Sequence, residues 1–247
     1  MEFSRLDQFQ ALWVGIAVAD AAAHGYIADV KRFAHPQPGS QPPVASSHWG
    51  KALIQVAHYV TTGGEKPQGI EIEQSALAIA ILHTPLLLRY LDASTDQYLV
   101  ALRQLGFSDC GESLSIQLYQ LLQVLLRHHP GQPLSMQLAA LQPWLDHPPR
   151  SEADRLLGRV LSHVLQTGGD FRLAIAGSLP MASSPLLPVL TGLICTALRG
   201  IQTIPIPWRQ ELALPPAAAG YWPQWGLSQE LELRGVAMQL WRTWAGL

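Results

Sequence analysis

Apolar side chains in this chain recur at helical spacing, and they nowhere alternate with polar side chains over a sustained run. The clearest helix is segment 152–166, whose apolar stripe consists of Leu156, Leu157, Val160, Leu161, Val164 and Leu165. Ser151 is a good N-cap for this helix, and Asp154 three residues later completes a weaker form of the capping box. Gly168 and Gly169 are expected to end it. Since period-two alternation is the mark of half-buried strands, its absence predicts an all-α fold.

Further helices are predicted at 8–23, around 53–60, at 74–91 with a break at Pro85, at 94–106, at 115–129 and from 228 onward. The proline and glycine content of segment 35–47 predicts a loop. We find no internal repeat and no linker long enough to divide the chain. The sequence therefore predicts a single domain over residues 1–247.

Charged residues make up 14% of the chain, whereas ordinary globular domains carry about 25%. Sixteen basic residues stand against eighteen acidic ones, so the chain lacks the basic footprint of a nucleic-acid-binding protein. A net charge near zero gives little electrostatic solubility. The composition therefore favours association with a partner and argues against nucleic acid.

Segment 173–198 contains no charged residue and is long enough to cross a bilayer. Because it holds Pro180, Pro185 and Pro188, we expect two buried helices joined by a loop, with no membrane span. Cys110 and Cys195 lie far apart in sequence and form neither a disulfide framework nor a zinc motif. The N-terminus lacks the pattern of a signal peptide, so we expect a cytoplasmic protein with two buried, reduced thiols.

The segment TGGDFRLAIAG at 167–177 looks like a catalytic metal-binding motif from which the chemistry has been removed. Two glycines, Asp170 and a following helix of small residues remain. Further acidic or hydroxyl ligands are expected at the next positions, but Arg172 and Leu173 stand there. An arginine cannot bind a metal ion, because its guanidinium is always charged.

Three islands of sequence match the motifs of a known family in order and rough spacing. The first is ALWVGIAVADA at 11–21, close to GxxxGLAxGDALG, and the second is SSHW at 46–49, in place of TDDT. The third matches GGDTDT-x-AAIAGAL at 168–177, and GLICTALRG at 192–200 and IPIPW at 204–208 follow it. With these islands the chain resembles the ADP-ribosylglycohydrolase family of the dinitrogenase-reductase-activating type. The resemblance implies a single-domain orthogonal helical bundle.

The resemblance also implies a site with two magnesium ions between the acidic motifs and ADP-ribose beside them. Two such ions need several carboxylate ligands. Here SSHW offers none, Arg172 replaces the second aspartate of the third motif, and Asp170 is the only retained motif ligand. We therefore expect a vestigial pocket without metal or other cofactor, formed by Asp20, Ser46, Ser47, His48, Gly168, Gly169, Asp170 and Arg172.

Two interpretations of Arg172 remain open at this point. The arginine can pair with Asp170 in a pocket that has lost its purpose. Alternatively, it can grip a phosphate group near a helix N-terminus, which favours anions.

Segment 215–226 is a loop rich in proline and glycine that carries Tyr221, Trp222 and Trp225. Exposed aromatic side chains on a loop are typical of a docking surface for a protein partner. The alternative is that the loop folds back and the tryptophans fill the core.

The sequence thus predicts a catalytically degenerate ADP-ribosylglycohydrolase-like protein that binds either a protein partner or a phosphorylated, nucleotide-like ligand such as ADP-ribose. The alternative is an active hydrolase that removes ADP-ribose from modified proteins, with magnesium held at an atypical site. A third hypothesis is a structural subunit of a larger assembly.

Overall fold

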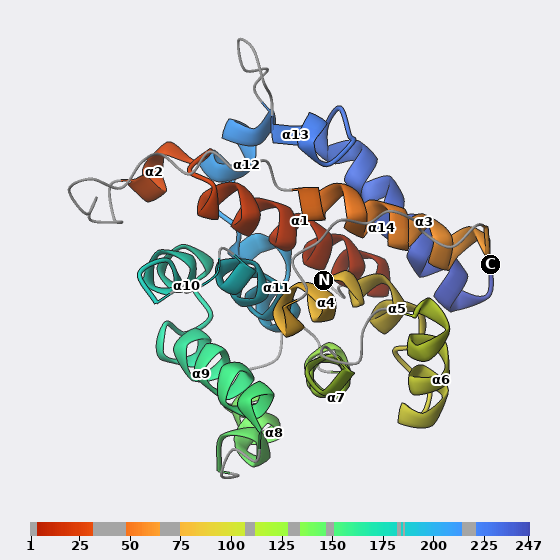
Figure 1. Ribbon diagram of the computed structural model, residues 1–247. Helices are drawn as coiled ribbons and strands as arrows, with labels where there is room; N and C mark the ends of the chain where they lie inside the picture. The colour runs from red at the N-terminus through yellow and green to blue at the C-terminus, as the bar shows by residue number, and fades with distance from the viewer. Residues whose placement is uncertain are drawn as a thin grey trace.

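The computed structural model of the chain describes residues 4–31, 48–64, 75–106, 112–127, 134–146, 151–181, 184, 186–213 and 221–247. Every regular element in these residues is a helix, which confirms the predicted all-α fold (Figure 1). The helices are α1 (Arg5–Ala23), α2 (Ala28–Lys31), α3 (His48–Thr62), α4 (Ala76–Leu82), α5 (Thr84–Arg89), α6 (Thr95–Leu105), α7 (Glu112–Arg127), α8 (Leu134–Asp146), α9 (Glu152–Gln166), α10 (Phe171–Ser178), α11 (Leu186–Arg199), the 3₁₀ turn η2 (Ile201–Thr203), α12 (Ile206–Ala213), α13 (Tyr221–Gln224) and α14 (Glu230–Ala245).

Helix α1 lies in the middle of the molecule and packs mainly against α11 and α14 (Figure 1). Apart from Gln10, its residues from Gln8 to Ala22 are buried. A helix that is apolar all round belongs in a core, which accounts for the small apolar residues that dominate this segment. The first sequence island therefore lies in this central helix, and segment 192–199 lies in α11, which packs against it.

Small residues let α1 and α11 approach closely. A Cβ atom placed on Gly192 of α11 would lie 2.6 Å from the Ala19 Cβ and 2.8 Å from the Gly15 carbonyl oxygen. A Cβ atom on Gly15 of α1 would in turn lie 2.5 Å from the side chain of Thr196. Both distances are shorter than van der Waals contact, so the two helices pack directly on these glycines.

The predicted ends of α9 are confirmed. At its start, the Ser151 hydroxyl accepts from the Asp154 amide at 3.0 Å, and the Asp154 carboxylate accepts from the Ser151 amide at 2.8 Å. At its end, Gly168 and Gly169 have left-handed backbones, with φ of 64° and 72°. Their amides donate to the carbonyls of residues 165 and 164, which is the bond pattern of a Schellman motif.

The uncharged segment 173–198 contains the end of α10 and nearly all of α11, with a break between them, as the prolines predicted. No helix among the described residues is long and apolar enough to span a membrane. Cys195 is a buried free thiol in α11, and burial raises the pKa of this thiol. Cys110 lies outside the described residues.

The predicted break near Pro85 is also present, since α4 and α5 meet at His83. The His83 side chain is buried, and its Nδ1 lies 2.7 Å from the Ser115 hydroxyl of α7. Burial disfavours the imidazolium form and lowers the pKa of His83 to about 4. The helix junction therefore depends on a neutral histidine.

This pKa predicts a loss of stability in acid. The unfolded chain takes up a proton at an ordinary histidine pKa of about 6.5, whereas the folded chain resists it until about pH 4. The contribution of His83 is therefore complete above about pH 6.5 and falls as the pH drops, by about 3 kcal/mol at pH 4. We expect the free energies of unfolding of wild type and His83→Asn, measured with denaturant, to converge over this range. Parallel pH profiles would contradict the assignment.

Candidate functional site

The carboxylate of Asp20, near the end of α1, is fully buried and is surrounded by hydrogen-bond donors. Its Oδ1 lies 3.1 Å from the Trp49 indole nitrogen and 3.0 Å from the His24 Nδ1. Its Oδ2 lies 2.8 Å from the Tyr221 hydroxyl and 3.1 Å from the Trp225 indole nitrogen. Each carboxylate oxygen offers about two acceptor sites, so these donors saturate the group.

The donors come from distant parts of the chain and pack against one another. Trp49 belongs to α3, directly after the second sequence island, whereas Tyr221 and Trp225 lie at α13 and just beyond it. The Trp49 and Trp225 rings meet edge to face at 5.3 Å, and Tyr221 and Trp225 lie 6.1 Å apart. The aromatic rings thus enclose Asp20 and exclude water while their polar atoms bind it.

The burial of these rings corrects the docking prediction. Tyr221, Trp222 and Trp225 are 3%, 4% and 0% exposed, so they do not form a docking surface in this structure. Trp222 and Trp225 lie in the core, as the alternative interpretation has them, whereas residues 214–220 of the segment lie outside the described residues. For Tyr221 and Trp225 the physical reason is that the buried Asp20 carboxylate needs donors, and a phenol or an indole supplies a donor on an apolar ring.

His24 stands one helical turn after Asp20, and its side chain is 6% exposed. Burial lowers the pKa of His24, but hydrogen bonds to Asp20 and the charge of that carboxylate outweigh the burial and raise the pKa above 6.5. The charged form of His24 is therefore stabilised, and this side chain places a positive charge next to the Asp20 carboxylate. The spacing of four residues on one helix was the sequence signal for this pair, and our sequence analysis missed it.

The third island forms a corner between two helices. Gly168 and Gly169 end α9, and Asp170 begins α10 as its N-cap, with its Oδ1 accepting from the Leu173 amide at 2.9 Å. The Thr203 hydroxyl fastens the corner by donating to the Gly169 carbonyl at 2.9 Å. Asp170 itself is exposed. The retained Gly-Gly-Asp sequence thus has a complete structural explanation in the geometry of the corner.

The capping role of Asp170 predicts a moderate effect on stability. Replacing Asp170 with alanine removes the bond to the Leu173 amide, and we expect a loss of about 1 kcal/mol in the free energy of unfolding. Asp170→Asn preserves an acceptor and is the matched control, with a stability near wild type. Chemical denaturation measures both. If Asp170→Ala were as stable as wild type, the capping role of the carboxylate would be contradicted.

Arg172 pairs with Asp29 of α2, so the predicted pair with Asp170 is wrong. The Arg172 Nη2 lies 3.0 Å from one Asp29 carboxylate oxygen and 3.2 Å from the other. The Trp208 indole nitrogen also donates to Asp29, at 3.1 Å. Arg172 lies one residue into α10 and reaches α2, whereas Asp170 is turned toward its own helix N-terminus. Sequence analysis had not singled out Asp29, which is 143 residues away.

The structure describes part of the predicted pocket. Asp20 and Asp170 share no hydrogen-bond partner in the part of the chain that the structure describes. Ser46 and Ser47 lie outside the described residues, and for His48 the structure describes the backbone, which begins α3, and not the side chain. Among the described residues, no three histidine, cysteine, aspartate or glutamate side chains are grouped so that they would hold a metal ion.

These residues therefore do not fit a pair of magnesium ions. Magnesium requires near-octahedral coordination by oxygen, and two ions require several carboxylates. The Asp20 oxygens face N–H and O–H groups, and Asp170 caps a helix. Arg172 adds a positive charge where the family motif has an aspartate. The described residues therefore offer no set of ligands for the two magnesium ions that the resemblance implies.

No protein-family model matches the chain, and no curated protein matches its sequence. Solved structures do show similarity to it. One is an ADP-ribosylglycohydrolase-related protein complex, with a TM-score of 0.62, 16% sequence identity, and coverage of 97% of this chain and 98% of the other. At this identity the likeness concerns the fold. The chain therefore has an all-helical fold similar to that of an ADP-ribosylglycohydrolase-related protein over nearly its whole length.

Proposed function

We propose that this chain is an ADP-ribosylglycohydrolase-like protein that has lost metal-dependent hydrolysis and acts by binding. One observation carries the proposal: the Asp20 carboxylate is saturated by protein donors. A carboxylate that ligates a metal must present an oxygen to it, and here both oxygens are engaged. The donors are held by a packed aromatic cluster, so exchanging them for an ion would require the core to open.

The charges around the other islands support the same conclusion. Glycosidic hydrolysis by a dinuclear centre needs the metal ions to orient the substrate and to activate a water. Asp170 is used as a helix cap, and Arg172 is engaged with Asp29. Without enough ligands to hold the ions, the site has no group that would orient the substrate or activate the water.

The binding role has two candidate classes of partner, namely another protein and a phosphorylated small ligand. A net charge near zero favours association. The balance of sixteen basic and eighteen acidic residues argues against nucleic acid. A buried, reduced Cys195 is consistent with the cytoplasmic location that we include in the proposal.

The test combines an activity measurement with a metal titration on the full chain. An ADP-ribosylated protein is incubated with the chain and with magnesium or manganese, and released ADP-ribose is quantified. We expect no release above the rate without protein, and no heat of metal binding by calorimetry. An active family member serves as the positive control. Metal-dependent release that disappears in Asp20→Asn or Asp170→Asn would overturn the proposal and establish an active hydrolase with an atypical site.

A further inference from the structure

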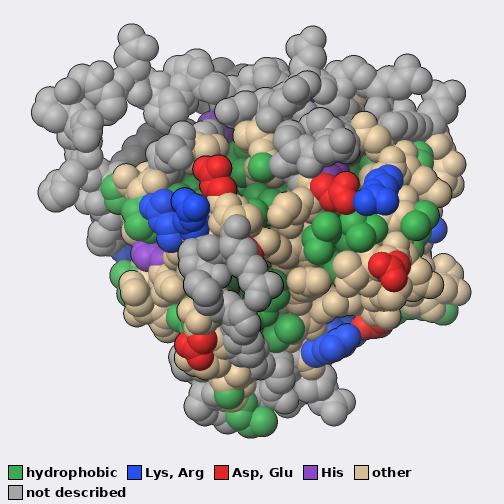
Figure 2. All heavy atoms as spheres, turned by 60° about the horizontal axis from the view of Figure 1, so that its bottom comes forward, with side chains coloured by type: hydrophobic (Ala, Val, Ile, Leu, Met, Phe, Trp, Pro, Cys, Tyr) green, Lys and Arg blue, Asp and Glu red, His purple; other side chains and the backbone are tan. Residues whose placement is uncertain are grey.

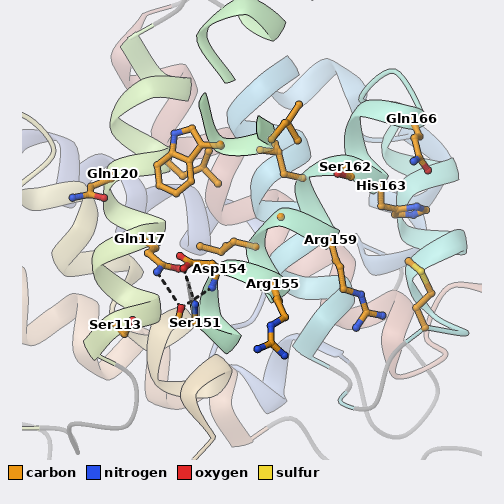
Figure 3. A pocket seen from close by; sticks show the side chains of 17 residues that line it. Ser113, Gln117, Gln120, Ser151, Asp154, Arg155, Arg159, Ser162, His163 and Gln166 are labelled. Atoms are coloured by element: carbon orange, nitrogen blue, oxygen red, sulfur yellow. Dashed lines mark hydrogen bonds between the residues drawn. The ribbon is translucent and has the colours of Figure 1, made fainter. Parts of the chain in front are cut away.

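A large cleft lies between α7, α8 and α9, away from the Asp20 cluster (Figure 3). Its volume is about 990 Å³, at the upper end of the range of about 300 to 1,000 Å³ that small-molecule sites occupy. None of the residues predicted for the vestigial pocket lines it. The cleft is therefore separate from the site that the sequence motifs indicated.

The edge of the cleft on α9 carries a positive charge. Arg155 and Arg159 are exposed and stand four residues apart, which places them on one face of the helix (Figure 3). Neither makes an ion pair with any described residue, whereas Arg103, Arg172, Arg209 and Arg234 each pair with a carboxylate. On the face that Figure 2 shows, basic and acidic side chains occur as scattered small groups, several of them with both signs side by side. Arg155 and Arg159 thus place two guanidinium groups without a carboxylate partner among the described residues at the same edge of the cleft.

The acidic side chain in the cleft takes part in the capping box of α9. Asp154 is the one acid among the described residues that line the cleft. Its carboxylate accepts from the Ser151 amide at the start of α9, and the Gln117 amide of α7 donates to the Ser151 hydroxyl at 3.4 Å (Figure 3). This network fixes the polar groups at one end of the cleft, whereas Arg155 and Arg159 lie outside it.

Gly158 lies between the two arginines and keeps the helix surface open. A Cβ atom at this position would meet no other atom within 4 Å. Packing therefore does not require glycine there, although glycine is less favourable than alanine inside a helix. The absence of a side chain leaves the α9 backbone accessible from the cleft.

Another part of the lining is apolar. Leu121, Leu157 and Leu161 are buried and form a hydrophobic base, and Trp144 of α8 contributes an aromatic ring. An apolar base with a few convergent polar groups is typical of small-molecule sites, whereas a docked helix needs a long apolar groove.

We propose that this cleft binds a phosphorylated small molecule of the nucleotide class. Arg155 and Arg159 bind its phosphate groups, as guanidinium groups do through paired N–H donors. Trp144 and Leu145, which are half-buried and line the cleft, receive its flat apolar part. This inference names a ligand class for the binding role proposed above and rests on that proposal, but it does not involve the Asp20 cluster.

Calorimetry on the full chain tests the inference with four probes, namely ADP, AMP, adenosine and pyrophosphate, in the presence of a chelator. We expect ADP to bind more tightly than AMP, and both to bind more tightly than adenosine or pyrophosphate. Arg155→Gln and Arg159→Gln should each weaken ADP binding by about tenfold, because each removes a charge-assisted contact. Gly158→Phe should abolish binding, since its side chain would enter the cleft.

Arg242→Gln is the matched control, because Arg242 is also an exposed helical arginine but lies near the end of α14. It should bind ADP like wild type. The arginine variants alter exposed side chains, so folding, checked by circular dichroism, should remain intact. The inference is overturned if no probe binds below about 1 mM, or if the arginine variants bind ADP like wild type. Metal-dependent hydrolysis in the earlier assay would refute the proposed function instead, so the two failures are distinguishable.

Discussion

Replacing Asp20 with alanine should lower the free energy of unfolding by about 3 to 5 kcal/mol, because it leaves buried donors without their acceptor. The Trp49 and Trp225 indole nitrogens would lose the bonds that the structure shows them making to protein. Tyr221 would keep the Ala17 carbonyl as a partner. Domains of this kind are stable by about 5 to 15 kcal/mol in total, so the change is a large part of the whole. Denaturant unfolding followed by circular dichroism measures it.

The direction of this effect separates a structural carboxylate from a catalytic one. A carboxylate kept for metal binding is a burden in the metal-free protein, so its removal leaves stability unchanged or raises it. If Asp20→Ala fails to fold, Tyr221→Phe tests the same cluster by removing one hydroxyl without changing the ring. We expect that variant to lose about 1 to 2 kcal/mol. Wild-type stability in both variants would contradict the account of the cluster.

Replacing Gly192 with valine should destabilise the protein by about 3 kcal/mol or more, because the new side chain has no space between α11 and α1. Its Cβ would lie 2.8 Å from the Gly15 carbonyl oxygen, which belongs to the backbone and cannot rotate away. The central helices would have to separate, and the core contacts between them would weaken. We expect a lower midpoint of thermal and denaturant unfolding for this variant.

Gly235 of α14 provides the matched control. A Cβ atom there would meet nothing within 4 Å, so Gly235→Ala should raise stability by about 0.5 to 1 kcal/mol through helix propensity. Gly192→Ala gains the same propensity but suffers the clash, and should still be less stable than wild type. If the two alanine variants behaved alike, the close packing of α1 on α11 would not be what requires Gly192.

The fold was predictable to the extent that local signals determine it. The ends of α9 follow from Ser151 and Asp154 at one side and two glycines at the other, all within four residues of the helix. Helices α8 and α12 were not predicted; their apolar patterns are interrupted by Pro143 and Pro207. Tertiary packing stabilises these two helices, and the periodicity of the sequence does not reveal that packing.

The site was predictable only in its components. The motif islands identified Asp20 and Asp170, but the partners of Asp20 include side chains 201 and 205 residues later in the chain. The pairing of Arg172 with Asp29 is likewise a contact between distant segments. Nothing in the spacing of a single sequence specifies such contacts. The pair of Asp20 and His24 was the exception, since both lie on one face of α1.

The separation between Asp20 and Tyr221 also has a consequence for biosynthesis. At about 5 to 20 residues per second, a ribosome needs about 10 to 40 seconds to add the 201 positions between them. Until then the nascent chain carries the Asp20 carboxylate in a largely apolar helix without two of its final hydrogen-bond donors. Premature compaction around α1 is therefore penalised, and translation of the last segment supplies the contacts that allow the interior to close.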